Sequence, residues 1–212
     1  GYPNVVYDPE SAARGDGPWR LWYGDIGGEG SGQYLLYANS SDGIMWDKPD
    51  LNRYDLNSRW ANDPDVAKYG KHNNIIMFGG GLGMYRDVHE KNASLRYKIS
   101  GGAPAGCYDE NGDTGCLVGT AGSPNGISNW SDVVPLGFPA PWRPDCHTNL
   151  FWDEVLQQYI MTTRSFEDPD GRLISIARTG GGGRNVFVKN GSWIALYHDM
   201  YPPASSAESC FK

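Results

Sequence analysis

The sequence contains no long apolar run and no cluster of basic residues. No apolar stretch approaches the ~20 residues that a membrane-spanning helix needs, so we expect no insertion into a membrane. The formal net charge is −7 and the lysines and arginines are scattered, so no face is expected to bind nucleic acid. The segment "GYPNVVYDP" at 1–9 lacks the basic and apolar regions of a signal peptide.

Motifs for cofactors, metals and serine nucleophiles are also missing. The glycine runs at 79–83 and 180–183 have no Gly-Lys-Ser/Thr ending, and no Gly-x-Ser-x-Gly occurs. The four histidines lack the spacing of a metal site. "DENGDTG" at 109–115 opens like a calcium loop, but Thr114 replaces the expected glycine and no suitable glutamate follows. The sequence therefore predicts no cofactor and no metal, and a polar hairpin tip at 109–115.

Glycine, proline and apolar residues are abundant. Hydrophobic residues make up 39% of the 212-residue chain, enough for a buried core. The 29 glycines and 14 prolines are unfavourable for helices but common where many short strands are joined by tight turns. This composition favours an all-β fold.

A group of three strands occurs three times along the chain. Each group opens with a β-rich run that ends in an aspartate, at Asp8, Asp87 and Asp153. Second strands are predicted at 19–25, 95–101 and 158–164, and third strands at 32–40, 115–123 and 171–179. Repeats of this kind predict a β-propeller built from four-stranded antiparallel blades.

The repeats divide the chain into three full units and part of a fourth. Their expected bounds are about 1–78, 79–142, 143–184 and 185–212. The fourth unit is predicted because Trp193–Asp199 resembles Trp19–Asp25 in its tryptophan, tyrosine and aspartate. All four would form one propeller domain, or a fragment of one. Closing a five-bladed ring at this repeat length needs roughly 300 residues. We therefore expect an incomplete ring whose open edges are covered by a neighbouring copy or a partner chain.

A polar turn is repeated between the first two groups, as "SSDGIMW" at 40–46 and "SPNGISNW" at 123–130. Gly43 is expected to adopt positive φ in a tight turn, and Trp46 and Trp130 to be buried between neighbouring sheets. Because the turn recurs, the structural interpretation is favoured over the alternative of a ligand-binding loop.

Sequons and cysteines indicate a secreted glycoprotein. Four Asn-x-Ser sequons lie near turn signals, at Asn39, Asn92, Asn129 and Asn190. Cys107 and Cys116 flank the hairpin tip and can form a disulfide, which leaves Cys146 and Cys210 to each other. Disulfides persist in oxidising, extracellular compartments.

A family resemblance rests on four stretches, "YANSSDGIMWDKPDL", "NNIIMFGGGLGMYRDVHEKNASLRYKISG", "SPNGISNW" and "HTNLFWDEVLQQYIMTTR". Together they resemble the five-bladed β-propeller glycosidases of families 32 and 43 and their uncharacterised secreted relatives. The resemblance covers most of residues 1–180 and implies a carbohydrate ligand. It also implies acids in an Asp-Pro-Asn of the first blade, in a later Arg-Asp-Pro and in a glutamate beyond.

The residues at these acid positions differ from the family pattern. "GYPN" puts Tyr2 where the first acid is expected, before Pro3 and Asn4. Asp87 follows an arginine but precedes Val88, and it is equivalent to Asp8 and Asp153, which favours a turn-forming role. Asp87 remains a candidate catalytic residue, with Tyr2 and Asn4 as candidate substrate contacts.

The segment "WRPDCHTN" at 142–149 is the best remaining candidate site. Asp145 and His147 alternate along a predicted strand, so both can point into the central funnel. They are candidate catalytic residues, and Arg143 and Trp142 are candidate substrate contacts. The alternative is a hydrogen-bonded Asp–His–Arg cluster without catalysis.

Three functions fit these features. We expect a secreted glycan-associated propeller that binds carbohydrate or serves a structural role, because Asp145 lacks the carboxylate partner that glycoside hydrolysis requires. An active glycoside hydrolase using Asp145 and a second carboxylate is one alternative. A structural subunit of an extracellular glycoprotein assembly is the other.

Overall fold

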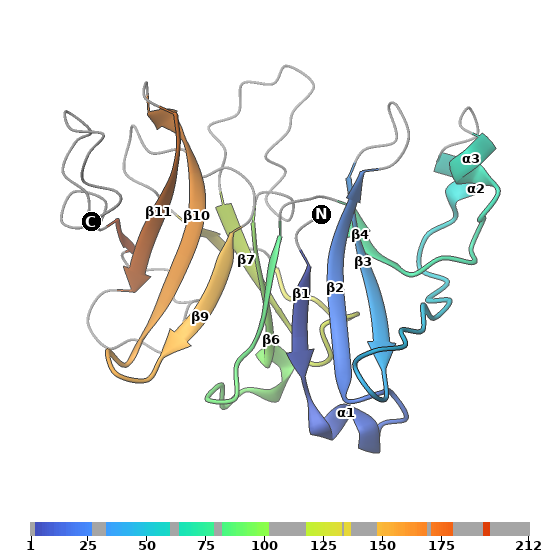
Figure 1. Ribbon diagram of the computed structural model, residues 1–212, viewed down its shortest axis with the longest axis horizontal. Helices are drawn as coiled ribbons and strands as arrows, with labels where there is room; N and C mark the ends of the chain where they lie inside the picture. The colour runs from blue at the N-terminus through green and yellow to red at the C-terminus, as the bar shows by residue number, and fades with distance from the viewer. Residues whose placement is uncertain are drawn as a thin grey trace.

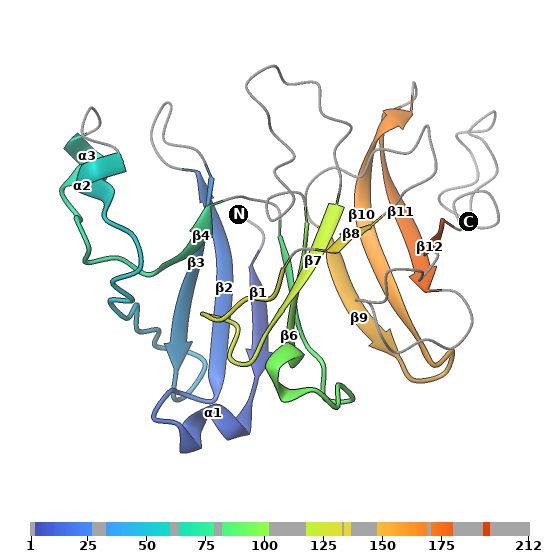
Figure 2. The ribbon, with the colours of Figure 1, turned by 180° about the vertical axis from the view of Figure 1, so that it is seen from behind.

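The fold is all-β, and the residues that the structure describes form three antiparallel sheets with little helix. The computed structural model describes residues 3–26, 33–59, 64–78, 82–101, 118–132, 134–136, 148–168, 171–179 and 193–195. The three sheets stand side by side in chain order (Figures 1 and 2). Sheet 2, formed by β5–β8, lies between sheet 1, formed by β1–β4, and sheet 3, formed by β9–β12. Within the described residues, no helix is both long and apolar enough to cross a membrane.

Each sheet consists of four strands that pair in chain order. Sheet 1 contains β1 (Asn4–Tyr7), β2 (Trp19–Ile26), β3 (Gln33–Ser40) and β4 (Ile75–Phe78). Sheet 2 contains β5 (Gly83–Arg86), β6 (Tyr97–Gly101), β7 (Val118–Ser123) and β8 (Val134–Leu136). Sheet 3 contains β9 (Asn149–Asp153), β10 (Gln158–Asp168), β11 (Gly171–Thr179) and β12 (Trp193–Ala195). The three strands predicted in each group are therefore present.

The strand β12 lies within the fourth unit that the sequence predicts from about 185. Thr179 pairs with Trp193, so β12 is the fourth strand of sheet 3. A three-stranded sheet would leave β11 as an unpaired edge, and β12 supplies the missing hydrogen-bond partners. The resemblance of Trp193 to Trp19 concerned residue type and not position in the sheet.

Helices are short and lie in the connections between strands. Pro9 begins α1 (Pro9–Ala13), where Asp8 caps the helix by accepting from the Glu10 backbone N–H. The connection from β3 to β4 contains α2 (Leu56–Arg59) and α3 (Pro64–Ala67), at the outer edge of sheet 1 (Figure 1). A 3₁₀ turn, η1 (Ala93–Leu95), precedes β6.

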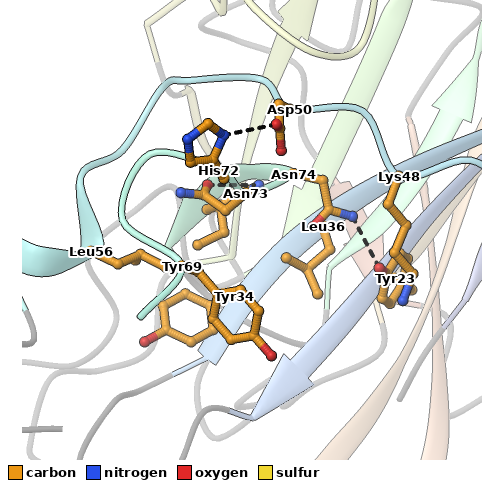
Figure 3. A pocket seen from close by; sticks show the side chains of 11 residues that line it. Tyr23, Tyr34, Leu36, Lys48, Asp50, Leu56, Tyr69, His72, Asn73 and Asn74 are labelled. Atoms are coloured by element: carbon orange, nitrogen blue, oxygen red, sulfur yellow. Dashed lines mark hydrogen bonds and ion pairs between the residues drawn. The ribbon is translucent and has the colours of Figure 1, made fainter. Parts of the chain in front are cut away.

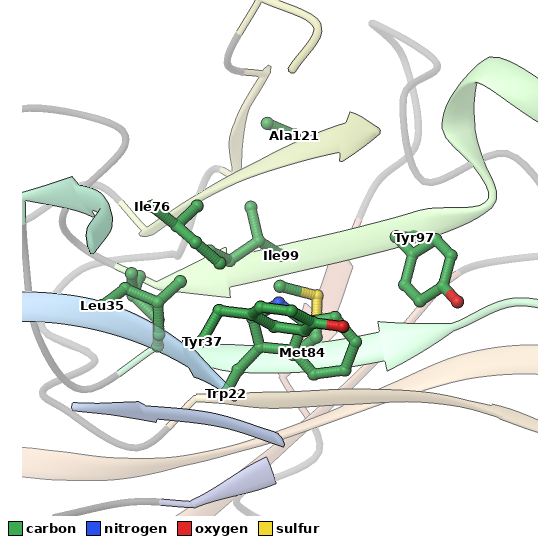
Figure 4. Close-up of a cluster of buried hydrophobic side chains, with 9 residues drawn as sticks. Trp22, Leu35, Tyr37, Ile76, Met84, Tyr97, Ile99 and Ala121 are labelled. Atoms are coloured by element: carbon green, nitrogen blue, oxygen red, sulfur yellow. The ribbon is translucent and has the colours of Figure 1, made fainter. Parts of the chain in front are cut away.

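The main described core lies between sheets 1 and 2. Trp22, Tyr37, Tyr97 and Ile99 have essentially no exposed surface and pack with Leu35, Ile76, Leu82, Met84 and Ala121 (Figure 4). The guanidinium of Arg20 lies 4.8–5.0 Å from the ring centroids of Trp22, Tyr37 and Tyr97. Burial of this cation is compatible with stability because three aromatic faces and two hydrogen bonds surround it.

The two repeated turns have the same geometry, but their tryptophans are less buried than expected. Gly43 and Gly126 have φ of +77° and +69°, as the tight turn predicted for Gly43 requires. Trp46 and Trp130 are each only partly buried. In the second turn, Ile127 and Trp130 both pack against the core while partly buried.

Candidate functional site

The sequence-predicted site residues fall largely outside the part of the chain that the structure describes. This applies to Tyr2, Asn190, the four cysteines (107, 116, 146 and 210) and the cluster of Trp142, Arg143, Asp145 and His147. Their roles stay predictions. Asn4, Asp87 and three of the sequon asparagines are described.

Asn4 joins the first strands of sheets 1 and 2. Its side-chain amide donates to the Leu82 carbonyl at 3.2 Å and accepts from the Met84 N–H at 3.2 Å. Both bonds go to backbone groups of the neighbouring segment, so the side chain holds β1 against β5. Its predicted contact with substrate stays a prediction.

Asp87 is fully buried between sheets 2 and 3. Its carboxylate accepts a hydrogen bond from the Tyr159 hydroxyl, and Lys98 Nζ lies 3.2 Å from Oδ2. Burial, and then the hydrogen bond with Asp87, raise the pKa of Tyr159, so the phenol stays protonated as the donor. The carboxylate is thus bound to groups that hold two sheets together, and its predicted catalytic role stays a prediction.

The described sequon asparagines differ in exposure. Asn92 and Asn129 are exposed, whereas Asn39 is half-buried within β3. The Asn92 side-chain oxygen accepts from the Ser94 N–H and hydroxyl, which leaves its amide nitrogen, the atom that carries a glycan, directed away from these bonds.

Sequence reasoning missed a pocket at the outer edge of sheet 1, which we call the outer pocket. It has a volume of about 360 Å³ and lies between the sheet and the long connection from β3 to β4 (Figure 3). Its lining consists of Tyr23, Tyr34, Leu36, Lys48, Asp50, Leu56, Tyr69, His72, Asn73, Asn74 and Ile75. The volume is in the range of small-molecule sites.

The floor of the outer pocket is buried and fixed. Tyr34, Leu56 and Ile75 form a small buried cluster. The Asn73 amide donates to the carbonyls of Tyr54 and Gly70, both at 2.9 Å, so the connection is held against the sheet. These bonds keep the pocket open without a ligand.

Polar and aromatic groups surround the mouth of the outer pocket. His72 Nδ1 lies 3.0 Å from Asp50 Oδ2, and Asn74 donates to the Tyr23 hydroxyl at 3.0 Å (Figure 3). The ammonium of Lys48 lies 6.0 Å from the centroid of the Tyr23 ring. Tyr69 is 53% exposed, and the Lys68 ammonium lies 5.4 Å from the centroid of its ring. The mouth therefore offers hydrogen-bond donors, acceptors and a flat apolar surface.

The single signal for this pocket in the sequence is the length of the connection. Residues 41–74 separate two adjacent strands and contain seven residues of the lining, at 48, 50, 56, 69, 72, 73 and 74. Long ordered loops are often functional. Over the described ranges, no cluster of three or more His, Cys, Asp or Glu residues is arranged to hold a metal ion.

Comparison with known proteins gives a similarity of fold. No protein-family model and no curated protein sequence matches the chain. A solved structure is similar, the crystal structure of an N-acetylgalactosamine deacetylase from F. plautii in complex with blood group B trisaccharide. The TM-score is 0.55 and the sequence identity 15%, over 92% of this chain and 51% of the deacetylase chain. At this identity the similarity concerns the fold alone, and the chain spans about half the length of that enzyme.

Proposed function

We propose that this chain is part of a secreted β-propeller glycoprotein that binds carbohydrate without hydrolysing it, and that the outer pocket is the binding site. The observation that carries the proposal is the combination of an exposed tyrosine ring with fixed polar groups around an open pocket.

The propeller part of this proposal is supported by the arrangement of the sheets. Each sheet is a four-stranded antiparallel meander, and the first strand of each contacts the first strand of the next, β1 with β5 and β5 with β9. This places equivalent strands side by side, as blades around an axis require. The family resemblance in the sequence predicts the same fold.

Carbohydrate binding is supported by the chemistry of the outer pocket. Sugars present hydroxyl groups, which both donate and accept, and faces of C–H bonds, which pack on aromatic rings. Asp50 accepts hydrogen bonds, Lys48 donates them, and Tyr69 provides an exposed ring. The structure of similar fold was determined with a bound trisaccharide, which adds weight to a sugar ligand.

Binding without hydrolysis is supported by the number of acids. Glycoside hydrolysis requires two carboxyl groups about 5–9.5 Å apart. Among the described residues that line the outer pocket, Asp50 is the single carboxylate, and it is paired with His72. In the central funnel that the sequence predicts, Tyr2 replaces the expected acid, so Asp145 also lacks an evident partner.

Glycan-array screening followed by calorimetric titration tests the proposal. We expect Tyr69→Ala to weaken binding about tenfold, because the stacking surface is lost. Val88→Ala is the control, since Val88 is 57% exposed and lies just after β5, outside the pocket lining. Equal loss in both variants, or no binding by the wild-type chain to any glycan, would overturn the proposal.

A further inference from the structure

The two repeated turns are equivalent in hydrogen bonding. In the first turn (40–46), Ser40 Oγ accepts from the Gly43 N–H and Asp42 Oδ1 accepts from the Ile44 N–H. In the second turn (123–130), Ser123 Oγ and Asn125 Oδ1 accept in the same way from the N–H groups of Gly126 and Ile127. The two turns therefore present equivalent atoms.

The second turn packs on sheet 1. Arg20 donates to the Asn125 carbonyl at 2.7 Å and Trp22 Nε1 donates to the Gly126 carbonyl at 2.8 Å. A methyl group added to Gly126 would lie 2.7 Å from the Trp22 ring and 3.0 Å from the Tyr97 ring. The turn that follows the third strand of one sheet is thus a contact with the preceding sheet.

The first turn has no such neighbour. Ile44 and Met45 are 78% and 74% exposed, whereas Ile127, the equivalent of Ile44, is partly buried against the core. No sheet formed by the described residues packs on this turn. An apolar pair of this exposure on a repeated contact element indicates an interface.

Side chains on the first strand of sheet 1 are also more exposed than their equivalents in sheets 2 and 3. Strand register makes Val5 equivalent to Met84 and Leu150, and Tyr7 equivalent to Trp152. Val5 and Tyr7 are 53% and 55% exposed. In contrast, Met84, Leu150 and Trp152 are at most 7% exposed, and their strands β5 and β9 contact the preceding sheet. We call the part of this side of sheet 1 that Val5, Tyr7, Trp19, Ile44 and Met45 form the rear face. Tyr23 and Leu36 of the outer pocket lie on the same side of the sheet, outside the rear face.

A matching surface is open on sheet 3. Register makes Phe151 equivalent to Val6 and Tyr85. Val6 and Tyr85 are partly buried, with Val6 packed against the core shared with sheet 2, but Phe151 is 40% exposed. We call the side of sheet 3 that carries Phe151 and Asp153 the front face.

A side-chain hydrogen bond joins each sheet to the preceding one, and its equivalent is missing at the rear face and at the front face. Tyr97 donates to Asp8 and Tyr159 donates to Asp87, each to the aspartate that ends the first strand of the preceding sheet. Trp19 stands at the position of these tyrosines, and its Nε1 has no hydrogen-bond partner in the described part of the chain. At the other end, Asp153 uses Oδ1 for two backbone N–H groups, while its Oδ2 has no partner among described residues. The Trp19 indole at the rear face of one copy can therefore donate to the Asp153 carboxylate at the front face of another copy.

We propose that two copies of this chain associate head to tail, with the rear face of sheet 1 packed on the front face of sheet 3 of the partner subunit. Trp19 donates to Asp153 of the partner subunit, and Ile44 and Met45 contact its second strand as Ile127 contacts sheet 1. Joined at both faces, the sheets that the described residues form in two copies number six, which is within the range of closed propellers. The interface is heterologous, and it closes into a ring in place of an open filament.

Sedimentation velocity and native mass spectrometry of the purified chain test this proposal. We expect a discrete species of twice the 23.3 kDa polypeptide mass, plus any glycan, across the micromolar range. Ile44→Asp should give a monomer with an unchanged circular dichroism spectrum, because the side chain is exposed in the single chain. Asp153→Asn keeps the turn-capping oxygen but puts an amide donor opposite Trp19, and should weaken dimerisation at least tenfold.

Mixing the two variants distinguishes a heterologous from an isologous contact. The Ile44→Asp chain keeps an intact front face and the Asp153→Asn chain keeps an intact rear face, so an equimolar mixture should form a heterodimer through one interface. A wild-type chain that stays monomeric over the micromolar range, or a mixture that forms no heterodimer, would overturn the proposal. Tyr69→Ala should remain dimeric, so loss of glycan binding and loss of association are separable.

Discussion

The phenolic hydroxyl of Tyr97 on β6 donates a hydrogen bond to the carboxylate of Asp8, which ends β1 in the neighbouring sheet. Tyr159 repeats the contact with Asp87 one sheet further along. Arg14 and Arg86 also contact the Asp8 carboxylate, at 2.9 and 3.1 Å. The same tyrosine–aspartate hydrogen bond thus links sheet 1 to sheet 2 and sheet 2 to sheet 3, each time through one buried carboxylate.

Replacing the donor of this contact should destabilise the fold. We expect Tyr97→Phe to lower the free energy of unfolding by about 2 kcal/mol, because a buried carboxylate loses a hydrogen bond. Chemical denaturation measures the change. Tyr69→Phe is the control, since Tyr69 is exposed, and should change stability by less than about 0.5 kcal/mol. Equal effects of the two substitutions would contradict the structural role of the contact.

Asp8 should also make stability depend on acid pH. Burial raises the pKa of the Asp8 carboxyl, but the hydrogen bonds from Tyr97 and Arg14 and the charge of Arg86 outweigh it, so the pKa lies below its ordinary value of 3.8. The native state then binds fewer protons than the unfolded state, and the stabilisation is present above pH 3.8 and is lost as pH falls through the lowered pKa.

Unfolding measured from pH 5 to pH 2 tests this dependence. We expect the stability difference between wild type and Asp8→Asn to shrink as the pH falls through this range. A difference that stays constant or grows would show that the native pKa of Asp8 is not depressed.

The two glycine turns provide a matched pair of substitutions. Gly43 and Gly126 share a positive φ, so alanine at either position costs about 1 kcal/mol of backbone strain. At Gly126 the new methyl group also meets Trp22 and Tyr97, whereas at Gly43 it lies 3.3 Å from the Trp19 ring. We expect Gly126→Ala to cost about 3 kcal/mol and Gly43→Ala about 1 kcal/mol in thermal or chemical unfolding. A larger loss at Gly43 would mean that the second turn is not the packed one.

Glycan occupancy should follow the exposure of the sequons. Material secreted from eukaryotic cells should carry glycans at Asn92 and Asn129, which are exposed, but little at half-buried Asn39. Peptide mapping with and without enzymatic deglycosylation measures this, and the same maps report the predicted disulfide between Cys107 and Cys116. Unmodified Asn92 and Asn129 together with free thiols would contradict secretion.

The sequence predicted the strands of the repeat but not the contacts between sheets. Each strand triplet was visible because β-branched and aromatic residues alternate between turn signals, and the equivalence of Asp87 with Asp8 was visible in its position. The donors to these aspartates are 89 and 72 residues away in the chain, so no local pattern reveals them.

Two features of the structure could not be predicted from the sequence, for different reasons. The strand Trp193–Ala195 is short, and its residues resembled those of Trp19–Asp25, which favoured a new unit over a fourth strand. The outer pocket could not be predicted because its walls combine a sheet with a long connection that has no periodic pattern. Only the fold shows that Tyr69 and His72 face Tyr23 and Asn74 across one cavity.

Product analysis of a bound glycan tests the central claim most directly. The purified chain is incubated with its best ligand from the array, and the glycan is examined by mass spectrometry over time, alongside Asp145→Asn. We predict that the ligand is recovered intact in both samples while calorimetry still reports binding, because Asp50 is the one carboxylate among the described residues of the outer pocket and the sequence has Tyr2 where the family pattern expects the first acid. Cleavage by the wild-type chain that Asp145→Asn abolishes would contradict the account and establish a glycoside hydrolase.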